Sequence, residues 1–326
     1  MPAKILIALI LLLSFSSGRA GEIQSDHIKT GALAFGTLNW EITVMRDQGL
    51  DKLHHLNLET ATLASPEAGK IALQSGSVDI IVGDWIWVAR QRMQGRDFVF
   101  APYSTSHGAL VVPVTSKIND VRDLPGKRLG IAGGGQDKNW LLLRAMALKE
   151  YKVDLDALVE KTFAAPPLLS QSLEQGRLDA VLTYWNQSAR LQAKGYRQVL
   201  DGQQIIEHLG IKARVPALGY IFRESWAKAH PEALAGFLQA ANAARDALCT
   251  SSLAWAQVAP LTQETDPNLQ EAVKNHYCEG RITQFGAPEI KAASEIFEYI
   301  TRVDNTGSGP AQPSLPSAVF WTGLPH

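Results

Sequence analysis

The chain has 326 residues, of which 46% are hydrophobic, 31 are basic and 32 are acidic. Its formal net charge of −1 gives no electrostatic footprint for nucleic acid or for an anionic membrane surface, so neither is an expected partner. The length exceeds what one hydrophobic core usually holds, and it predicts two domains.

The first twenty residues have the pattern of a cleavable export signal. Lys4 gives a positive start, and the apolar run 5–15 is shorter than the roughly 20 residues that span a bilayer. Gly18 and Ala20 occupy the −3 and −1 positions of a cut after Ala20. We therefore expect export to the periplasm, with an uncleaved anchor as the alternative. Without residues 1–20 the chain keeps 29 basic and 32 acidic residues, a net charge of −3.

The chain contains two cysteines, Cys249 and Cys278. An oxidising compartment allows them to pair, so a disulfide is the expected role. The alternative, a catalytic or metal-binding role, is disfavoured because neither cysteine has a CxxC motif or a Cys/His cluster around it. We expect no metal and no cofactor.

Short apolar runs alternate with helical patterns, which predicts an α/β fold with largely parallel sheets. In the first third, the expected strands are 28–35, 56–63 and 78–82, and helices are expected at 39–48, 66–75 and 88–93. Ser65 and Pro66 have the residue types of a helix cap and a first helical position. A strand at 109–114 is expected to leave this lobe.

The rest of the chain repeats this alternation of strands and helices. Strands are expected at 129–132, 161–164 and 180–183, a long helix at 137–151, a returning strand at 217–222, and helices at 231–248, 252–261, 268–278 and 289–303. These elements predict one lobe from residues 21–112 and 216–304 and a second from 113–215. Two hinge crossovers are expected at Pro113 and Pro216. The tail at 305–326 is expected to be loose or to lie along the surface.

Four phrases follow one another along the chain: ALQSGSVDIIVGD (72–84), VRDLPGKRLGIAGGG (121–135), SLEQGRLDAVLTYW (172–185) and FRESWAKAHPEALAGFLQA (222–240). Together they resemble periplasmic substrate-binding proteins of ABC transporters, in the nitrate/sulfonate/taurine and thiamine-precursor group. The resemblance implies a two-lobed periplasmic-binding-protein type II fold, with a mixed, mostly parallel sheet in each lobe. It also implies a monomer that captures a small organic molecule and delivers it to an ABC permease in the inner membrane. The loop Ala34–Glu41 departs from relatives, so the ligand class is not carried over.

The carboxyl ends of the expected strands supply the candidate ligand-binding residues, because α/β proteins bind ligands at that edge. They are Thr37, Asn39, Trp40, Glu41, Ser65, Asp84 and Trp85 in the first lobe, and Gly134, Gly135, Asp137, Trp140, Pro166, Tyr184, Trp185 and Asn186 in the second. Any one of the tryptophans is more often a core residue than a ligand contact.

Two ligand classes fit this set. Aromatic rings favour a small aromatic molecule or a cation, with Glu41, Asp84 and Asp137 as counter-charges. The glycine loop 133–135 opens a helix, and it favours a sulfonate-like anion unless it is a plain tight turn. The sequence leaves the sign of the ligand's charge open.

No catalytic arrangement is visible among these residues. Glu41, Asp84 and Asp137 have no partnered histidine or cysteine, and the segment 104–107 has no GxSxG motif. We therefore expect a binding protein and not an enzyme. A ligand-sensing accessory protein of a periplasmic pathway and a secreted enzyme on the same fold are the alternatives.

Overall fold

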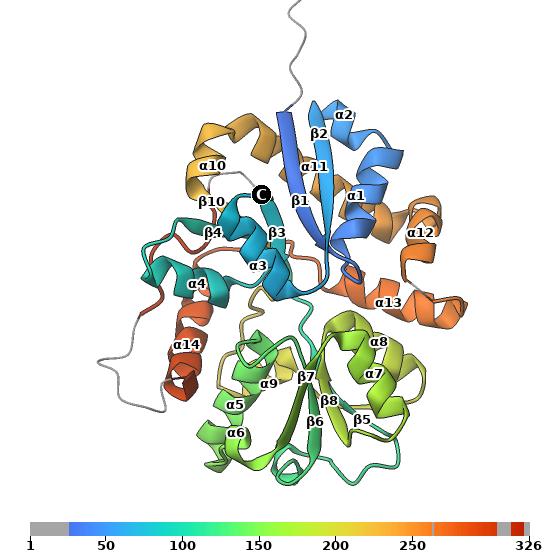
Figure 1. Ribbon diagram of the computed structural model, residues 1–326, viewed down its shortest axis with the longest axis vertical. Helices are drawn as coiled ribbons and strands as arrows, with labels where there is room; N and C mark the ends of the chain where they lie inside the picture. Colours follow the sequence, from blue (N-terminus) through green and yellow to red (C-terminus); the bar gives the residue numbers. More distant parts are fainter. Residues whose placement is uncertain (1–25, 263, 305–313, 323–326) are drawn as a thin grey trace, which may run out of the picture.

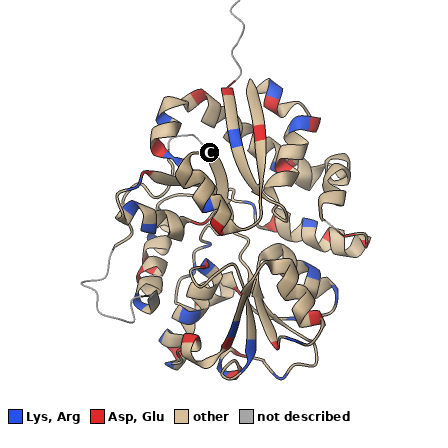
Figure 2. Ribbon diagram, viewed as in Figure 1, with Lys and Arg blue, Asp and Glu red and all other residues tan. Residues whose placement is uncertain are grey.

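The computed structural model describes residues 26–262, 264–304 and 314–322, which form two α/β lobes, one above the other in Figure 1. Acidic and basic residues are distributed over both lobes (Figure 2). The predicted signal segment, residues 1–20, lies outside the described residues. Within the described part of the chain, no helix has both the length and the apolar character needed to cross a membrane.

The first lobe contains a five-stranded sheet with the order β2-β1-β3-β10-β4. Its strands are β1 (Asp26–Leu33), β2 (Leu56–Leu63), β3 (Ile80–Gly83), β4 (Phe98–Ser104) and β10 (Leu218–Arg223). β1 pairs in parallel with β2 and β3, whereas β10 lies antiparallel between β3 and β4. The helices that follow the first strands are α1 (Leu38–Asp47), α2 (Leu50–Leu53), α3 (Pro66–Ser75) and α4 (Trp85–Met93).

The second lobe contains a sheet of the same design, with the order β7-β6-β8-β5-β9. Its strands are β5 (Ala109–Val112), β6 (Arg128–Ala132), β7 (Glu160–Ala164), β8 (Ala180–Thr183) and β9 (Arg197–Asp201); its helices are α5 (Lys138–Tyr151), α6 (Leu155–Leu158), α7 (Pro166–Glu174), α8 (Trp185–Ala193) and α9 (Gly202–His208). The fourth strand in each sheet order, β10 in the first lobe and β5 in the second, is antiparallel to both of its neighbours. Each of these two strands is the first strand after the chain has passed over from the other lobe. The expected fold class is confirmed.

The first crossing lies earlier than expected. β5 pairs with β8 and β9, so the prediction that this strand belongs to the first lobe, with a hinge at Pro113, is wrong. The chain passes between the lobes at residues 105–108, and it returns at residues 209–217, which contain Pro216. The local pattern of β5, four buried apolar residues, predicts a strand but does not indicate which sheet it joins.

The last helices connect the two lobes. They are α10 (Glu224–Ala229), α11 (Pro231–Thr250), α12 (Ser252–Val258), α13 (Pro267–Glu279) and α14 (Ala287–Asp304). α11 packs on α1 of the first lobe, but α13 packs against α8 and α14 against α5, both in the second lobe (Figure 1). The prediction that all of 216–304 belongs to the first lobe is therefore wrong for α13 and α14, which also pack against helices of the second lobe.

Part of the expected loose tail is docked. The backbone N–H of Phe100 donates to the carbonyl of Val319, and that of Trp321 donates to the carbonyl of Phe100, each at 2.8 Å. Val319 and Phe320 are buried, and the ring of Phe320 packs on those of Phe100 and Trp85. These three residues lie along the edge of β4, so of the two alternatives the loose tail is wrong for them.

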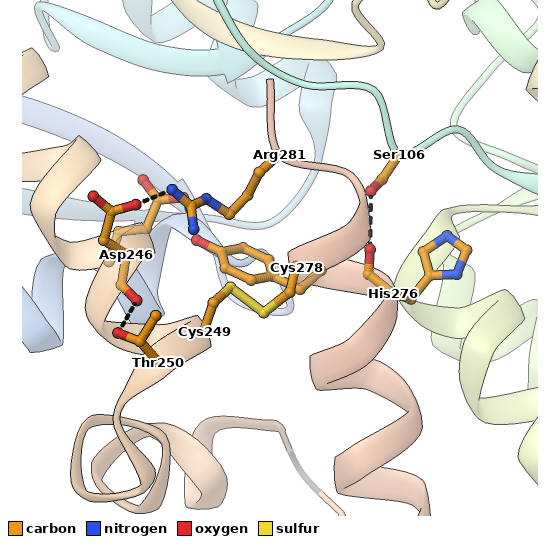
Figure 3. Close-up of a disulfide and its surroundings, with 9 residues drawn as sticks. Ser106, Asp246, Cys249, Thr250, His276, Cys278 and Arg281 are labelled. Atoms are coloured by element: carbon orange, nitrogen blue, oxygen red, sulfur yellow. Dashed lines mark hydrogen bonds and ion pairs between the residues drawn. A yellow bond between two sulfur atoms is a disulfide. The ribbon is translucent and has the colours of Figure 1, made fainter. Parts of the chain in front are cut away.

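A disulfide joins Cys249, near the end of α11, to Cys278, near the end of α13 (Figure 3). We expect the double variant Cys249→Ser/Cys278→Ser to lose about 3 to 4 kcal/mol of unfolding free energy, because the bridge closes a long loop in the unfolded chain. Urea denaturation of the oxidised protein, the reduced protein and the variant measures this. The reduced protein should match the variant; a variant as stable as the oxidised protein would contradict the expectation.

Candidate functional site

A cavity of about 110 Å³ lies between the lobes. Residues at the carboxyl ends of β1, β3 and β8 line it, together with β4, the 105–108 crossing, α3 and the start of α5. Its charged lining residues are Glu67, Lys70, Asp84, Asp137 and Lys138. This is the sheet edge at which α/β proteins bind ligands.

Asp84 and Asp137 come from different lobes, and each caps a helix. Oδ1 of Asp84 accepts the N–H of Trp87 at 2.9 Å at the start of α4. Oδ1 of Asp137 accepts the N–H of Asn139 at 2.9 Å at the start of α5. These hydrogen bonds hold both carboxylates in place at the cavity wall.

The three acidic residues act electrostatically on Tyr184, which lines the same cavity. Burial raises the pKa of its hydroxyl, and the charges of Asp137, Glu67 and Asp84 raise it further. Burial also raises the pKa of Asp137; Lys138 opposes this shift and Asp84 adds to it. Since the lining has three carboxylates and two lysines, it carries a formal charge of −1.

The lysines already face acidic neighbours. Nζ of Lys70 lies 3.8 Å from the carboxylate of Glu67, one helical turn away on α3. Lys138, which is buried, follows Asp137 directly, and its charge lowers the pKa of that carboxyl. Each lysine of the cavity therefore has an acidic neighbour.

Four aromatic side chains also line the cavity. Phe35, Tyr103, Tyr184 and Trp185 line the cavity, and Trp185 is only 5% exposed. The Trp185 ring is stacked on the His276 ring of α13, with centroids 5.5 Å apart and planes within 5°. A cation beside such rings gains from their negative faces.

Six of the residues predicted from the sequence line this cavity: Thr37, Asp84, Asp137, Tyr184, Trp185 and Asn186. One of them connects the lobes directly: the amide nitrogen of Asn186 on α8 donates to the carbonyl of Phe35 at 3.2 Å. The other nine predicted residues do not line it.

Three predicted tryptophans are core residues. Trp40, Trp85 and Trp140 are 2%, 2% and 0% exposed. Trp40 is surrounded by the rings of Trp185, Trp255 and Tyr277. Trp85 donates from Nε1 to the carbonyl of Pro216 at 3.0 Å, so it ties α4 to the return crossing. A position just after a strand end therefore does not show whether a tryptophan faces the cavity, as Trp185 does, or the core.

Glu41 is a structural acid and not a ligand counter-charge. It is fully buried; the hydroxyl of Tyr277 donates to its Oε1 at 3.0 Å, and that of Tyr220 donates to its Oε2. A nitrogen of Arg245 lies 3.7 Å from the same carboxylate. Burial raises the pKa of Glu41, while Arg245 and the two hydroxyls act in the opposite direction.

The remaining predicted residues serve local structure. Asn39 donates to the carbonyl of Leu33 at 2.7 Å, Ser65 accepts the N–H of Ala68 as the cap of α3, and Pro166 is the first residue of α7. Gly134 and Gly135 lie outside the cavity, and the carboxylate of Asp137 occupies the start of α5. Of the two interpretations of the glycine loop, a tight turn and an anion position, the cap by Asp137 favours the tight turn.

A comparison of the sequence with models of protein families identifies the family of this chain. The model of the NMT1/THI5-like family matches residues 41–251. The chain belongs to this family. Comparison with curated protein sequences gives no match.

Solved structures show that the NMT1/THI5-like chain has the fold of periplasmic binding proteins. The alkanesulfonate-binding protein SsuA from Xanthomonas axonopodis pv. citri, bound to MOPS, is 16% identical with a TM-score of 0.72 over 90% of this chain and 98% of that one. The aliphatic sulphonate binding protein SsuA from Escherichia coli is 18% identical, with a TM-score of 0.66 over 86% and 92%. The nitrate-binding protein NrtA from Synechocystis PCC 6803 is 12% identical, with a TM-score of 0.54 over 73% and 66%.

The cavity between the lobes of this NMT1/THI5-like protein is also lined by residues that were not among the candidates predicted from the sequence. Glu67 and Lys70 lie in the first turns of α3, and helical spacing from Ser65 could have indicated them. Tyr103 lies on β4, a strand that was not predicted, so no signal placed it at the cavity. In the described part of the chain, no group of three or more His, Cys, Asp or Glu side chains is arranged to hold a metal ion.

Proposed function

We propose that this chain is a monomeric periplasmic solute-binding protein that holds a small organic cation between its lobes and delivers it to an ABC permease in the inner membrane. It carries out no chemistry on that ligand. The observation that carries the proposal is that Asp84, Asp137 and Glu67 line one cavity together with Tyr184 and three other aromatic residues. A cation there removes carboxylate repulsion and lies against ring faces.

The binding role is supported by the proteins that share this fold, which are named as alkanesulfonate-binding and nitrate-binding proteins. The charge of the ligand is argued from this chain alone. We propose a cation, in contrast to the sulfonate and nitrate in the names of those proteins, because three carboxylates and only two lysines line the cavity here.

The proposed closing mechanism depends on each lobe contributing a carboxylate to the cavity. A cation that contacts Asp84 in the first lobe and Asp137 in the second binds the joined arrangement better than separated lobes, so it shifts the population toward closure. The two chain crossings, residues 105–108 and 209–217, are the proposed hinge, and Pro216 lies within it. The closed form is the one that would dock on the permease.

Thermal unfolding of residues 21–326 against a ligand panel tests the ligand class. The panel contains choline, phenethylammonium, its neutral isostere 2-phenylethanol, benzenesulfonate and nitrate. We expect a saturable rise in the midpoint with a cation and none with 2-phenylethanol; a ligand at 100 times its Kd adds about 2.7 kcal/mol to the stability. A rise that occurs only with the anions and depends on Lys70 or Lys138 would contradict the cation proposal.

A further inference from the structure

A second and larger cavity, of about 450 Å³, lies within the first lobe. It is lined by residues 101–103 of β4, by α11, by residues 281–284 and by Trp321 of the docked tail. Tyr103 lines this cavity as well as the one between the lobes, so its ring lies between the two spaces.

The polar lining of the second cavity suits an anion. Arg245 and Arg281 both face it, together with the amides of Gln239, Asn242 and Gln284 and the hydroxyl of Thr283. Among the described residues that line it, none is an aspartate or a glutamate. This composition is opposite to that of the cavity between the lobes, where carboxylates are in the majority.

Arg245 is held rigidly and keeps donors for a guest. It is 8% exposed; one terminal nitrogen donates to the hydroxyl of Tyr220 at 2.6 Å, and the other donates to Oδ1 of Asn242 at 3.1 Å. These bonds use two of the five N–H groups of a guanidinium. Its acidic neighbour Glu41 lies 3.7 Å away, and both oxygens of that carboxylate already accept tyrosine hydroxyls.

The disulfide fixes the position of Arg281. This residue follows the end of α13 and lies three positions after Cys278, which is bonded to Cys249 of α11 (Figure 3). Asp246, one turn before Cys249, forms the ion pair with Arg281. The carbonyl of Gly280 accepts the N–H of Thr105 at 2.7 Å, so the loop is also anchored to the first crossing.

Two guanidinium groups therefore line one cavity, and their positive charges repel one another. Burial lowers the pKa of Arg281, and the charge of Arg245 acts in the same direction. An anion between them relieves this repulsion, and planar guanidinium groups match a carboxylate or sulfonate through paired hydrogen bonds.

We propose that this cavity is a second ligand site, which binds a small organic anion. Its carboxylate or sulfonate lies between Arg245 and Arg281, and its apolar part packs against Leu238, Ile282 and Trp321. The proposal does not depend on the function proposed for the cavity between the lobes, whose acidic lining calls for a ligand of opposite charge.

Titration calorimetry with benzoate tests the proposal, with benzamide as the neutral probe of the same shape. Residues 21–326 should bind benzoate at one saturable site and should not bind benzamide. Arg281→Gln should weaken benzoate binding about tenfold or more, because a charge-assisted pair is lost. Asp246→Asn is the matched control: it removes the partner of Arg281 but no lining residue, so affinity should stay the same or rise. Asp84→Asn, in the other cavity, should leave benzoate affinity unchanged.

Three results would overturn the proposal: no benzoate binding by the folded wild-type protein, equal binding by Arg281→Gln, or loss of binding in Asp84→Asn. Arg281→Lys guards against misfolding of the glutamine variant, since it keeps the charge but loses the planar fork; we expect intermediate affinity. Cation binding between the lobes can fail while benzoate binding succeeds, so the two proposals are judged separately.

Discussion

Replacing Glu41 with alanine should lower the free energy of unfolding by about 3 to 5 kcal/mol, because removal of one partner leaves a buried charge without its counter-ion. The remaining partner is Arg245, of which only 8% is exposed. The hydroxyls of Tyr220 and Tyr277 also lose the acceptor to which they donate. Urea denaturation, followed by circular dichroism, measures the effect.

Glu59→Ala is the matched control. Glu59 is an exposed acid on β2 that pairs with His27 and Lys29, and exposed pairs of this kind contribute about 1 kcal/mol or less. Glu41→Gln, which keeps an oxygen acceptor, should fall between the two. A Glu41→Ala protein as stable as Glu59→Ala would show that the network carries no stability. That result would favour the interpretation of Glu41 as a ligand-binding residue.

His107→Gln should remove a large part of the acid sensitivity of folding. His107 lies in the first crossing, 7% exposed, and its Nε2 lies 3.2 Å from the carbonyl of Val215 in the return crossing. Burial, reinforced by the charge of Lys138, lowers the pKa of its imidazole from 6.5 to about 3. Because each pKa unit is worth about 1.4 kcal/mol, the full penalty is on the order of 5 kcal/mol.

The direction of the effect follows from where the proton binds. Below pH 6.5 the unfolded chain takes up a proton on this imidazole while the folded chain does not, so the unfolding free energy falls as pH decreases, down to about pH 3. Urea denaturation at a series of pH values should give a shallower slope in this window for His107→Gln than for wild type. His55→Asn, at an exposed histidine, should keep the wild-type slope. Equal slopes for all three proteins would refute this role for His107.

Most of the fold could be predicted because its elements carry strong local signals. The strands 56–63 and 180–183 and the helix 66–75 have the expected bounds. β4 was missed because Pro102 interrupts an apolar run, and β9 because its residues are only partly buried. The assignment of β5 to the second sheet, and of α13 and α14 to both lobes, depends on pairing between distant segments, which local patterns do not contain.

The candidate site could be predicted to the level of strand ends and no further. Asp84 and Trp85 are neighbours in sequence, yet the first lines the cavity and the second packs in the core. The direction of a side chain after a strand end depends on the turn and on the helix that follows. The same limit applies to Glu41, whose partners Arg245 and Tyr277 lie far away in the sequence.

The central claim is that Asp84 and Asp137 together hold a cation between the lobes. Titration calorimetry of the panel's strongest cation against wild type, Asp84→Asn, Asp137→Asn and Asp266→Asn tests it most directly. Asparagine keeps the capping hydrogen bond and removes only the charge, and Asp266 caps α13 outside the cavity. We predict that each cavity variant weakens binding about tenfold or more, whereas Asp266→Asn binds like wild type. Unchanged affinity in both cavity variants would contradict the account.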